Sequence, residues 1–490
     1  MTPRFIIIML VVAALLAGVV YLVGRPGTAP AVEVAMMDLD APSIDRIELR
    51  WSADGSLGAT VARSADGTWV MQWRAGAARG TWPVLGSRVM AAIRLLGDVG
   101  GFSHAQQEEM GEPVWITLRA GDRSVELAAA KRSFGGRGVV VRTAGDGGAA
   151  NLAADVDGEL VQVFQRADVL AWRDMSVFPA DMTGASRVEM ITAAGASPGD
   201  AGTAMTRLAR VGGRWAMSSP ARARADVAQV EGMLAALKKL RVARFPDDQS
   251  GWTPPATSEP PRRIVIETDR RTPDAGPDGR WVLRQELVIR AGAGPEDDVA
   301  VAEATVSIVR PSGPAEILWG PTLIMIDAAT LNEVMRPAES FASRLATPVV
   351  AADVRMVEVA GGGEGFKATR RIDRWDDADG NELSLAQRDA VRTIIELLTS
   401  EPAVHVELAP VEPPPTDAVT IRLGGADGPP LAEVRCWIRP GQAGLKSLLI
   451  HSEGVTRVYS PDGTARWLEA TQRLGAVNAN DPADDAGSTR

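Results

Sequence analysis

The chain has 490 residues, of which 46% are hydrophobic, and this length is enough for about three globular domains of ordinary size. Its net charge is -10, from 52 basic and 62 acidic residues. Binding along a nucleic acid needs a basic surface, so this charge argues against a nucleic-acid partner.

The first predicted element is an uncharged apolar run of about 19 residues, from Phe5 to Val23. At about 1.5 Å per residue it is long enough for a bilayer core of roughly 30 Å, so we expect a transmembrane anchor over residues 1–24. Arg4 precedes it, which favours a single-pass protein of the cytoplasmic (inner) membrane with its N-terminus inside and its bulk in the periplasm. A cleaved signal peptide is the alternative, because Ala29-Pro30-Ala31 offers a cleavage site.

After this segment, one unit occurs three times: a strand with a central glutamate, a hairpin that ends at a tryptophan, and an amphipathic helix. The glutamates are Glu48, Glu189 and Glu358, and the tryptophans are Trp69, Trp215 and Trp375. The helices are expected near Ser87–Leu96, Asp226–Leu240 and Ser384–Leu398. We interpret the six residues as structural anchors of a repeat. Repetition favours an extended multi-domain surface over one catalytic centre.

A strand-rich segment follows each helix. Alternating apolar and polar residues predict half-buried antiparallel strands, for example over Val114–Arg119, Trp281–Arg290 and Leu431–Ile438. The proline-rich stretch Phe245–Arg263 is expected to be an extended joint within the second repeat. In the third, Cys436 is expected to be a buried strand residue. As the only cysteine of the chain, it excludes an intrachain disulfide.

These elements predict an α+β fold of three tandem related repeats, each made of antiparallel strands packed with amphipathic helices, after one N-terminal transmembrane helix. The predicted boundaries are 25–180, 181–350 and 351–476 for the repeat domains. The tail, 477–490, is polar and acidic and is expected to be disordered.

The clearest copy of the unit resembles a known family. Arg210-Val211-Gly212-Gly213-Arg214-Trp215 is followed by Ala225-Asp226, which offers an N-cap, and by a helix whose stripe includes Val230, Met233, Leu234, Leu237 and Leu240. This pattern is similar to a bacterial membrane-anchored family catalogued as domain of unknown function 4340, well over residues 186–245, fairly over 41–180 and weakly over 351–476. The resemblance implies an extracytoplasmic protein whose partner is an ABC transporter of the gliding-motility type. It implies no enzymatic activity and no cofactor.

Motifs that carry chemistry are few. Gly195-Ala196-Ser197-Pro198-Gly199 matches the string of the hydrolase nucleophile elbow, but a proline after the serine in a loop does not fit the strand-turn-helix context of that motif. The histidines, His104, His405 and His451, lie far apart without a second ligand at metal spacing. His104 with Glu108 is interpreted as a solvated helix face. The acidic run Asp376–Glu382 fails the calcium-loop spacing and is interpreted as a turn. We therefore predict no catalytic residue and no metal site.

The predicted function is that of a non-catalytic, membrane-anchored, extracytoplasmic accessory or interaction protein. An envelope glycan or other periplasmic ligand is the alternative, and it requires that exposed tryptophans line one groove. The candidates for that groove are Trp73, Trp82, Trp252 and Trp319. A hydrolase with an unrecognised site is the least favoured interpretation.

Overall fold

The structure, a computed structural model, describes residues 39–64, 67–75, 78–99, 103–104, 111–132, 137–142, 152–193, 203–246, 262–271, 279–291, 298–311, 313–361, 365–372, 374–408, 414–425, 429–440 and 446–475. The chain forms two compact units, Met1–Asp174 and Met175–Arg490.

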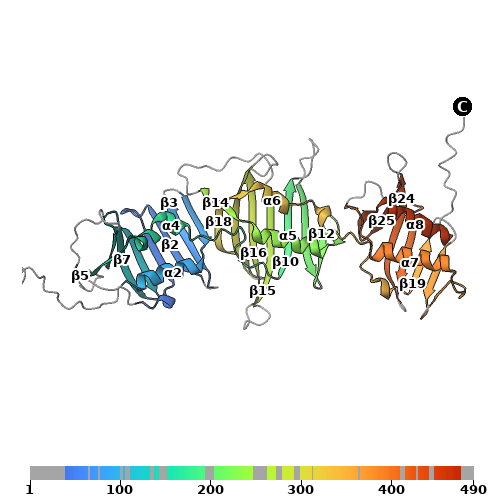
Figure 1. The fold of residues 1–490 in the computed structure, drawn as a ribbon, viewed down its shortest axis with the longest axis horizontal. Coiled ribbons are helices and arrows are strands. Elements are labelled where there is room, and N and C mark those ends of the chain that lie inside the picture. Colours follow the sequence, from blue (N-terminus) through green and yellow to red (C-terminus); the bar gives the residue numbers. More distant parts are fainter. Residues whose placement is uncertain are drawn as a thin grey trace, which may run out of the picture. The chain divides into compact units, whose positions relative to one another are not determined.

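The first unit contains one antiparallel sheet in the strand order β4-β3-β2-β1-β6-β7-β8-β9-β5 (Figure 1). Its strands are β1 (Arg46–Arg50), β2 (Leu57–Arg63), β3 (Trp69–Ala75), β4 (Ala78–Pro83), β5 (Ser103–His104), β6 (Val114–Ala120), β7 (Arg123–Lys131), β8 (Arg137–Arg142) and β9 (Leu152–Asp157). Its helices are η1 (Ala41–Ser43), α2 (Gly86–Gly97), α3 (Gly158–Val163) and α4 (Arg166–Leu170). In β1, Ile47 and Leu49 are buried, whereas Glu48 between them points to the other face, as a period of two requires.

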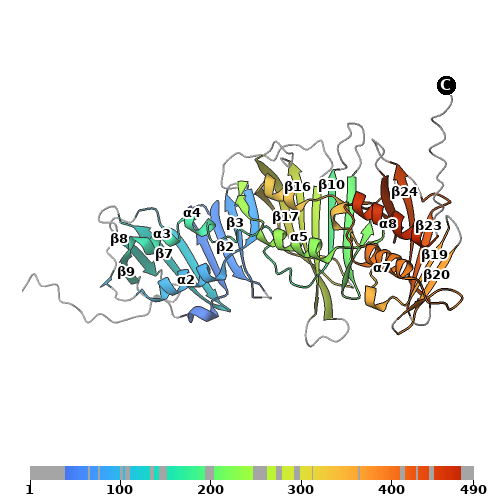
Figure 2. The same cartoon turned by 45° about the vertical axis from the view of Figure 1, so that its right-hand side comes forward.

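The second unit contains two antiparallel sheets. The first has the order β13-β12-β11-β10-β15-β16-β17-β18-β14. Its elements are β10 (Ala185–Ala193), β11 (Thr203–Val211), β12 (Arg214–Ser219), β13 (Ala223–Arg224), α5 (Val227–Lys239), β14 (Val242–Arg244), β15 (Arg262–Arg271), β16 (Arg280–Ala291), β17 (Val299–Val309), β18 (Glu316–Asp327), α6 (Ala328–Val334) and η4 (Ala338–Phe341). Helices α5 and α6 lie on one face of this sheet (Figures 1 and 2).

The other sheet of this unit has the order β21-β20-β19-β23-β24-β25-β26-β22. Its elements are η5 (Ala351–Asp353), β19 (Met356–Ala360), β20 (Phe366–Arg370), β21 (Trp375–Asp376), α7 (Leu385–Thr399), β22 (His405–Glu407), β23 (Val419–Gly424), β24 (Pro430–Pro440), β25 (Lys446–Ser452), β26 (Val455–Val458) and α8 (Pro461–Arg473). Helices α7 and α8 lie on one face of it (Figure 2).

The three sheets share one strand order, apart from one strand on the hairpin side. The strand with the central glutamate (β1, β10 or β19) lies inside the sheet, between the hairpin strands that follow it directly and a second run of four strands. The short strand after the long helix (β5, β14 or β22) crosses to the far edge and pairs with the last strand of that run. In the part of the chain that the structure describes, the third sheet has one strand fewer on the hairpin side.

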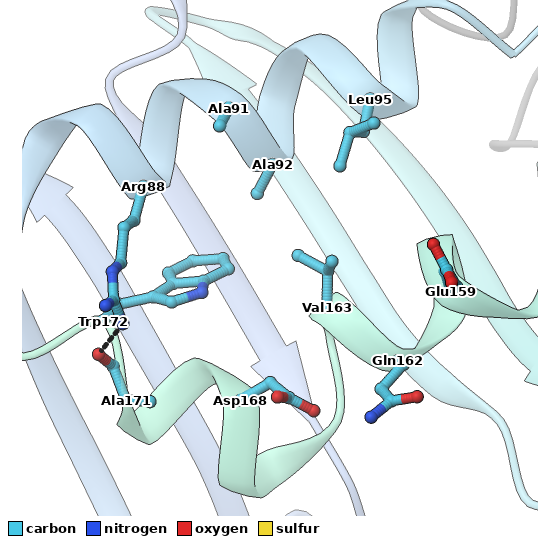
Figure 3. A pocket seen from close by; sticks show the side chains of 10 residues that line it. All are labelled: Arg88, Ala91, Ala92, Leu95, Glu159, Gln162, Val163, Asp168, Ala171 and Trp172. Atoms are coloured by element: carbon cyan, nitrogen blue, oxygen red, sulfur yellow. Dashed lines mark hydrogen bonds between the residues drawn. The ribbon is translucent and has the colours of Figure 1, made fainter.

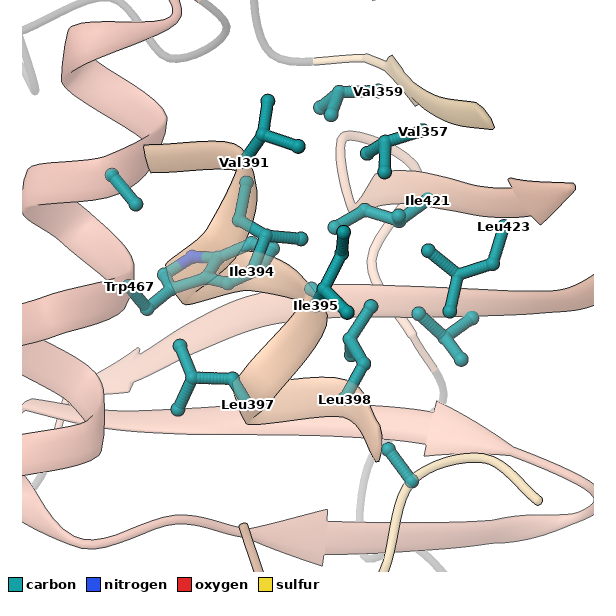
Figure 4. Packing of buried hydrophobic residues seen from close by; sticks show 14 of the residues in the cluster. Val357, Val359, Val391, Ile394, Ile395, Leu397, Leu398, Ile421, Leu423 and Trp467 are labelled. Atoms are coloured by element: carbon teal, nitrogen blue, oxygen red, sulfur yellow. The ribbon is translucent and has the colours of Figure 1, made fainter. Parts of the chain in front are cut away.

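The core of the third sheet shows how a helix covers a sheet face. Val391, Ile394 and Leu398 of α7 are fully buried. They pack toward Val357 of β19 and Ile421 of β23, on the apolar face of the sheet (Figure 4). Burying such a side chain contributes roughly 1.5–3 kcal/mol, so this helix holds its sheet mainly through its apolar stripe.

The expected α+β class is corrected. The described residues form three antiparallel sheets of nine, nine and eight strands, and the helices are a minor covering on them rather than a packed helical layer. The periodic apolar residues of a helix are a stronger sequence signal than those of a strand, so the prediction assigned the helices too large a part in the fold. Strand β15 was missed because its start at Arg262 falls in the proline-rich stretch interpreted as a joint. The predicted domain boundaries stay predictions.

The expected single-pass location in the inner membrane is also corrected. No helix within the described ranges is long and apolar enough to cross a bilayer. The segment Phe5 to Val23, on which the anchor was predicted, lies outside the described residues, as do residues 477–490 of the tail.

Candidate functional site

The three anchor tryptophans occupy equivalent places where a hairpin meets a helix. The backbone carbonyl of each accepts a hydrogen bond from a residue just before the helix: from Val84 to Trp69 (2.9 Å), from Ala225 to Trp215 (3.1 Å) and from Leu383 to Trp375 (2.8 Å). Trp69 and Trp215 are buried and Trp375 is half-buried. This bond fixes where the chain leaves the sheet and starts the helix.

Trp215 has the most polar surroundings of the three. Its indole nitrogen donates to Glu231 Oε1 at 2.9 Å, and Arg210 donates to the same oxygen at 2.6 Å while its guanidinium lies 5.1 Å from the indole centroid. The indole hydrogen bond, and after it Arg210, lowers the pKa of Glu231. The cluster thus keeps Glu231 ionised as a structural acceptor that joins β12 to α5.

The anchor glutamates lie on the sheet faces that the helices leave open. Each pairs with an arginine: Glu48 with Arg46 (3.1 Å) and Arg119 (3.3 Å), Glu189 with Arg207 (3.0 Å), and Glu358 with Arg422 (3.7 Å). Partly exposed pairs of this kind contribute about 0–1 kcal/mol each and mainly favour one strand register. The described contacts of the six anchors are thus made within their own sheets, at hairpin ends, helix starts and cross-strand pairs.

Of the side chains considered for chemistry, three lie in strands of the third sheet. His451 Nδ1 lies 3.0 Å from Thr456 Oγ1, and burial together with Arg457 and Arg435 lowers its pKa. Cys436 is buried in β24, as predicted, and burial raises the pKa of its thiol. His405 pairs in β22 with Val458.

The acidic run between β21 and α7 is organised by one carboxylate. Asp377 Oδ1 accepts from the backbone N–H groups of Asp379 (2.9 Å) and Asn381 (2.8 Å), and the Asn381 bond is the main cause of its lowered pKa. Asp376 is buried and pairs with Arg371 and Arg374. The described residues contain no group of three or more side chains suited to hold a metal ion.

Two sequence interpretations change or stay open. His104 lies in the two-residue strand β5, so its interpretation as part of a helix face is wrong. The string Gly195-Ala196-Ser197-Pro198-Gly199 lies outside the described residues, as does Trp252. Trp73, Trp82 and Trp319 are 3%, 0% and 4% exposed, so none of these three presents a ring to a sugar.

A groove of about 490 Å³ lies between α2, α3 and α4 of the first unit (Figure 3). Ala92 and Trp172 at its floor are buried, whereas Leu95 beside them is 41% exposed. Arg88 closes one end through a hydrogen bond to the Ala171 carbonyl, drawn dashed in Figure 3. The polar lining is completed by Glu159, Gln162 and Asp168. An apolar floor with a rim of mixed charge suits the binding of a partner's side chain.

A second hollow, of about 610 Å³, lies at the end of the β15–β16 hairpin in the second unit. We call it the arginine hollow; it is lined by Arg270, Arg271, Arg280 and Arg310, together with Asp269, Trp281, Val282, Val309 and Pro311. Sequence reasoning missed it. The available signal was Arg280 and Trp281 at the start of one predicted strand and Arg310 at the end of the next, in an acidic chain.

Comparisons with known proteins add no relative: no family model matches the chain, and no curated protein or solved structure matches it. The resemblance to the membrane-anchored family stays a prediction.

Proposed function

We propose that the chain is a non-catalytic accessory or interaction protein. The observation that carries this proposal is the strand order shared by the three sheets. A scaffold that repeats one topology uses its buried side chains for the same packing in each copy and leaves function to the surfaces. The anchor tryptophans and glutamates support it, because each serves a hairpin, a helix start or a cross-strand pair.

The groove between α2, α3 and α4 is the surface that we propose for partner contact. Leu95 is exposed next to the buried Ala92 and Trp172, so an apolar side chain from a partner would complete a half-formed apolar cluster. Arg88 and Asp168 at the rim carry opposite charges and would orient that partner. The resemblance makes a subunit of an ABC transporter of the gliding-motility type the partner to test first.

The test uses the tagged full-length chain and two matched substitutions. Leu95→Arg places a charge over the apolar floor, and Leu385→Arg makes the same change at the start of α7, where the leucine is 69% exposed. We expect wild type and Leu385→Arg to recover transporter subunits equally from native cells, and Leu95→Arg to recover less than a tenth as much, because a charge buried against apolar atoms is costly. Equal recovery by both variants, or no transporter subunit with wild type, would contradict the proposal.

The non-catalytic part is tested separately. The purified chain is incubated with a panel of esters, glycans and phosphoesters, and we expect no turnover. Turnover that disappears in Ser197→Ala or His451→Ala would overturn this part, whatever the partner experiment shows.

A further inference from the structure

The open face of the second sheet carries a ladder of cross-strand ion pairs. Its pairs are Arg187–Glu267 (3.1 Å), Arg207–Glu189 (3.0 Å), Arg263–Glu286 (2.8 Å) and Arg290–Glu303 (2.7 Å). Arg284 lies between two acids, 3.8 Å from Glu267 and 3.6 Å from Glu286. Opposite charges thus face each other across neighbouring strands, which is the arrangement that favours strand pairing.

One end of the same hairpin breaks this rule. The register of β15 and β16 places Arg271 directly opposite Arg280. Both side chains are exposed, and neither has an ion-pair partner among the residues that the structure describes. Like charges directly opposite each other disfavour strand pairing. The pair of Arg271 and Arg280 therefore destabilises the hairpin, whereas the ion pairs of the ladder stabilise the sheet. A bound anion between the two guanidinium groups would remove that cost.

The other arginines of the hollow already have partners. Arg270 donates to the carbonyl of Asp181 at 3.0 Å and to its carboxylate at 3.1 Å, and Arg310 donates to Glu316 at 2.7 Å. Their geometry is therefore held by the protein itself. Arg271 and Arg280 are the two guanidinium groups left to meet a ligand.

The apolar lining of the hollow favours an anion that also carries an apolar group. Trp281, Val282, Val309 and Pro311 line the hollow beside the arginines. A volume of about 610 Å³ lies within the usual range of small-molecule sites. A simple inorganic anion would use the arginines and leave this apolar surface uncovered. An aromatic or apolar body would cover it.

We infer that the arginine hollow binds a small organic oxyanion, with its carboxylate or phosphate group between Arg271 and Arg280 and an aromatic or apolar body against Val282 and Val309, which the register places on the same sheet face as the two arginines. The planar guanidinium group donates two parallel hydrogen bonds to oxyanions of this geometry. In a chain with a net charge of -10, a local cluster of positive charge also attracts an anion to this place rather than to the surrounding surface.

The experiment follows the indole signal of Trp281 by NMR in the full-length chain labelled with ¹⁵N-tryptophan, with Trp281→Phe to assign that signal. The probes are phenyl phosphate and benzoate as organic oxyanions, inorganic phosphate without a body, and benzyl alcohol without a charge. We expect saturable shifts with at least one organic oxyanion, and binding at least tenfold weaker for inorganic phosphate and for benzyl alcohol. The two organic probes distinguish a phosphate ligand from a carboxylate ligand.

Substitutions then assign the charge contacts. Arg271→Gln with Arg280→Gln should weaken binding at least tenfold, and Arg187→Gln, an arginine of the same sheet face that pairs with Glu267, should change it less than twofold. Unchanged signals of the other tryptophans show that the variants fold.

Three results would overturn the inference. These are equal binding of the neutral probe, equal loss in Arg187→Gln, and binding that occurs only after Asp274 and Asp278 are replaced by Asn. The last two acids belong to the loop between the strands, outside the described residues.

Discussion

Replacing Ile394 by alanine should destabilise the core of the third sheet, and the labelling rate of the Cys436 thiol should measure this loss. Ile394 is fully buried on α7 and belongs to the same apolar cluster as Cys436 of β24. The change removes three carbon atoms, worth about 0.8 kcal/mol each on transfer, and leaves a cavity, so we expect a loss of about 3 kcal/mol. Each 1.4 kcal/mol is a factor of ten in an equilibrium constant, so the open state should become roughly a hundredfold more populated.

The assay is the rate at which a thiol reagent labels Cys436. It is the only cysteine of the chain, it is fully buried, and β24 is an interior strand, so labelling requires the sheet to open. The labelling rate should therefore rise roughly a hundredfold in Ile394→Ala. The control is Ile372→Ala, because Ile372 is 89% exposed, and its rate should change less than twofold. A rise of less than tenfold in Ile394→Ala, or an equal rise in the control, would refute the placement of α7 over this sheet.

Three further predictions follow from local geometry. Ser384→Ala removes the capping box at the start of α7 and should cost about 1 kcal/mol, seen as about fivefold faster thiol labelling; an unchanged rate would argue against the cap. Glu407 forms a bidentate pair with Arg439, which lowers the pKa of Glu407 below its ordinary 4.5, so this pair stabilises the fold above that pH and the stabilisation is lost as the pH falls through the lowered pKa. Glu407→Gln should cost about 0.5–1 kcal/mol at pH 7. The urea midpoint measured at several pH values should then fall less steeply toward acid pH in the variant than in the wild type, and an equal fall in both would contradict this. Gly80→Ala would place a Cβ in steric overlap with the buried ring of Trp73 and should lower stability by about 1–3 kcal/mol, measured as a lower thermal midpoint in near-UV circular dichroism.

The helix starts are the features that the sequence predicted best. The N-cap at Asp226 is confirmed, because its side chain accepts from the backbone of Gln229 at 3.2 Å. The helix expected from about Ser384 to Leu398 is observed as Leu385–Thr399. Both depend on local signals, a capping side chain and an apolar stripe, which can be read from the sequence without knowledge of the strand order.

The amount of sheet and the two hollows were not predictable in this way. Strand β15 contains Ile264, Val265 and Ile266, a short apolar run that periodicity alone does not assign. The groove of the first unit joins α2 to α3 and α4, which are more than 60 residues away along the chain. Contacts at that separation follow from the strand order, and an apolar pattern in one sequence does not specify a strand order.

The arginine hollow depends on one further quantity, the hairpin register. Arg271 and Arg280 lie nine positions apart in the sequence. They become a directly opposed pair because of the register of β15 and β16, which also aligns Arg263 with Val288. A slip of one residue would carry every side chain of one strand to the other face, so Ile264 and Ile266 would leave the core. The apolar residues of the core therefore fix the register, and the register in turn holds two like charges together. The cost of that opposition is small beside the cost of exposing two isoleucines, which explains how a packed sheet maintains an unmatched pair of arginines at the place where a ligand can use it.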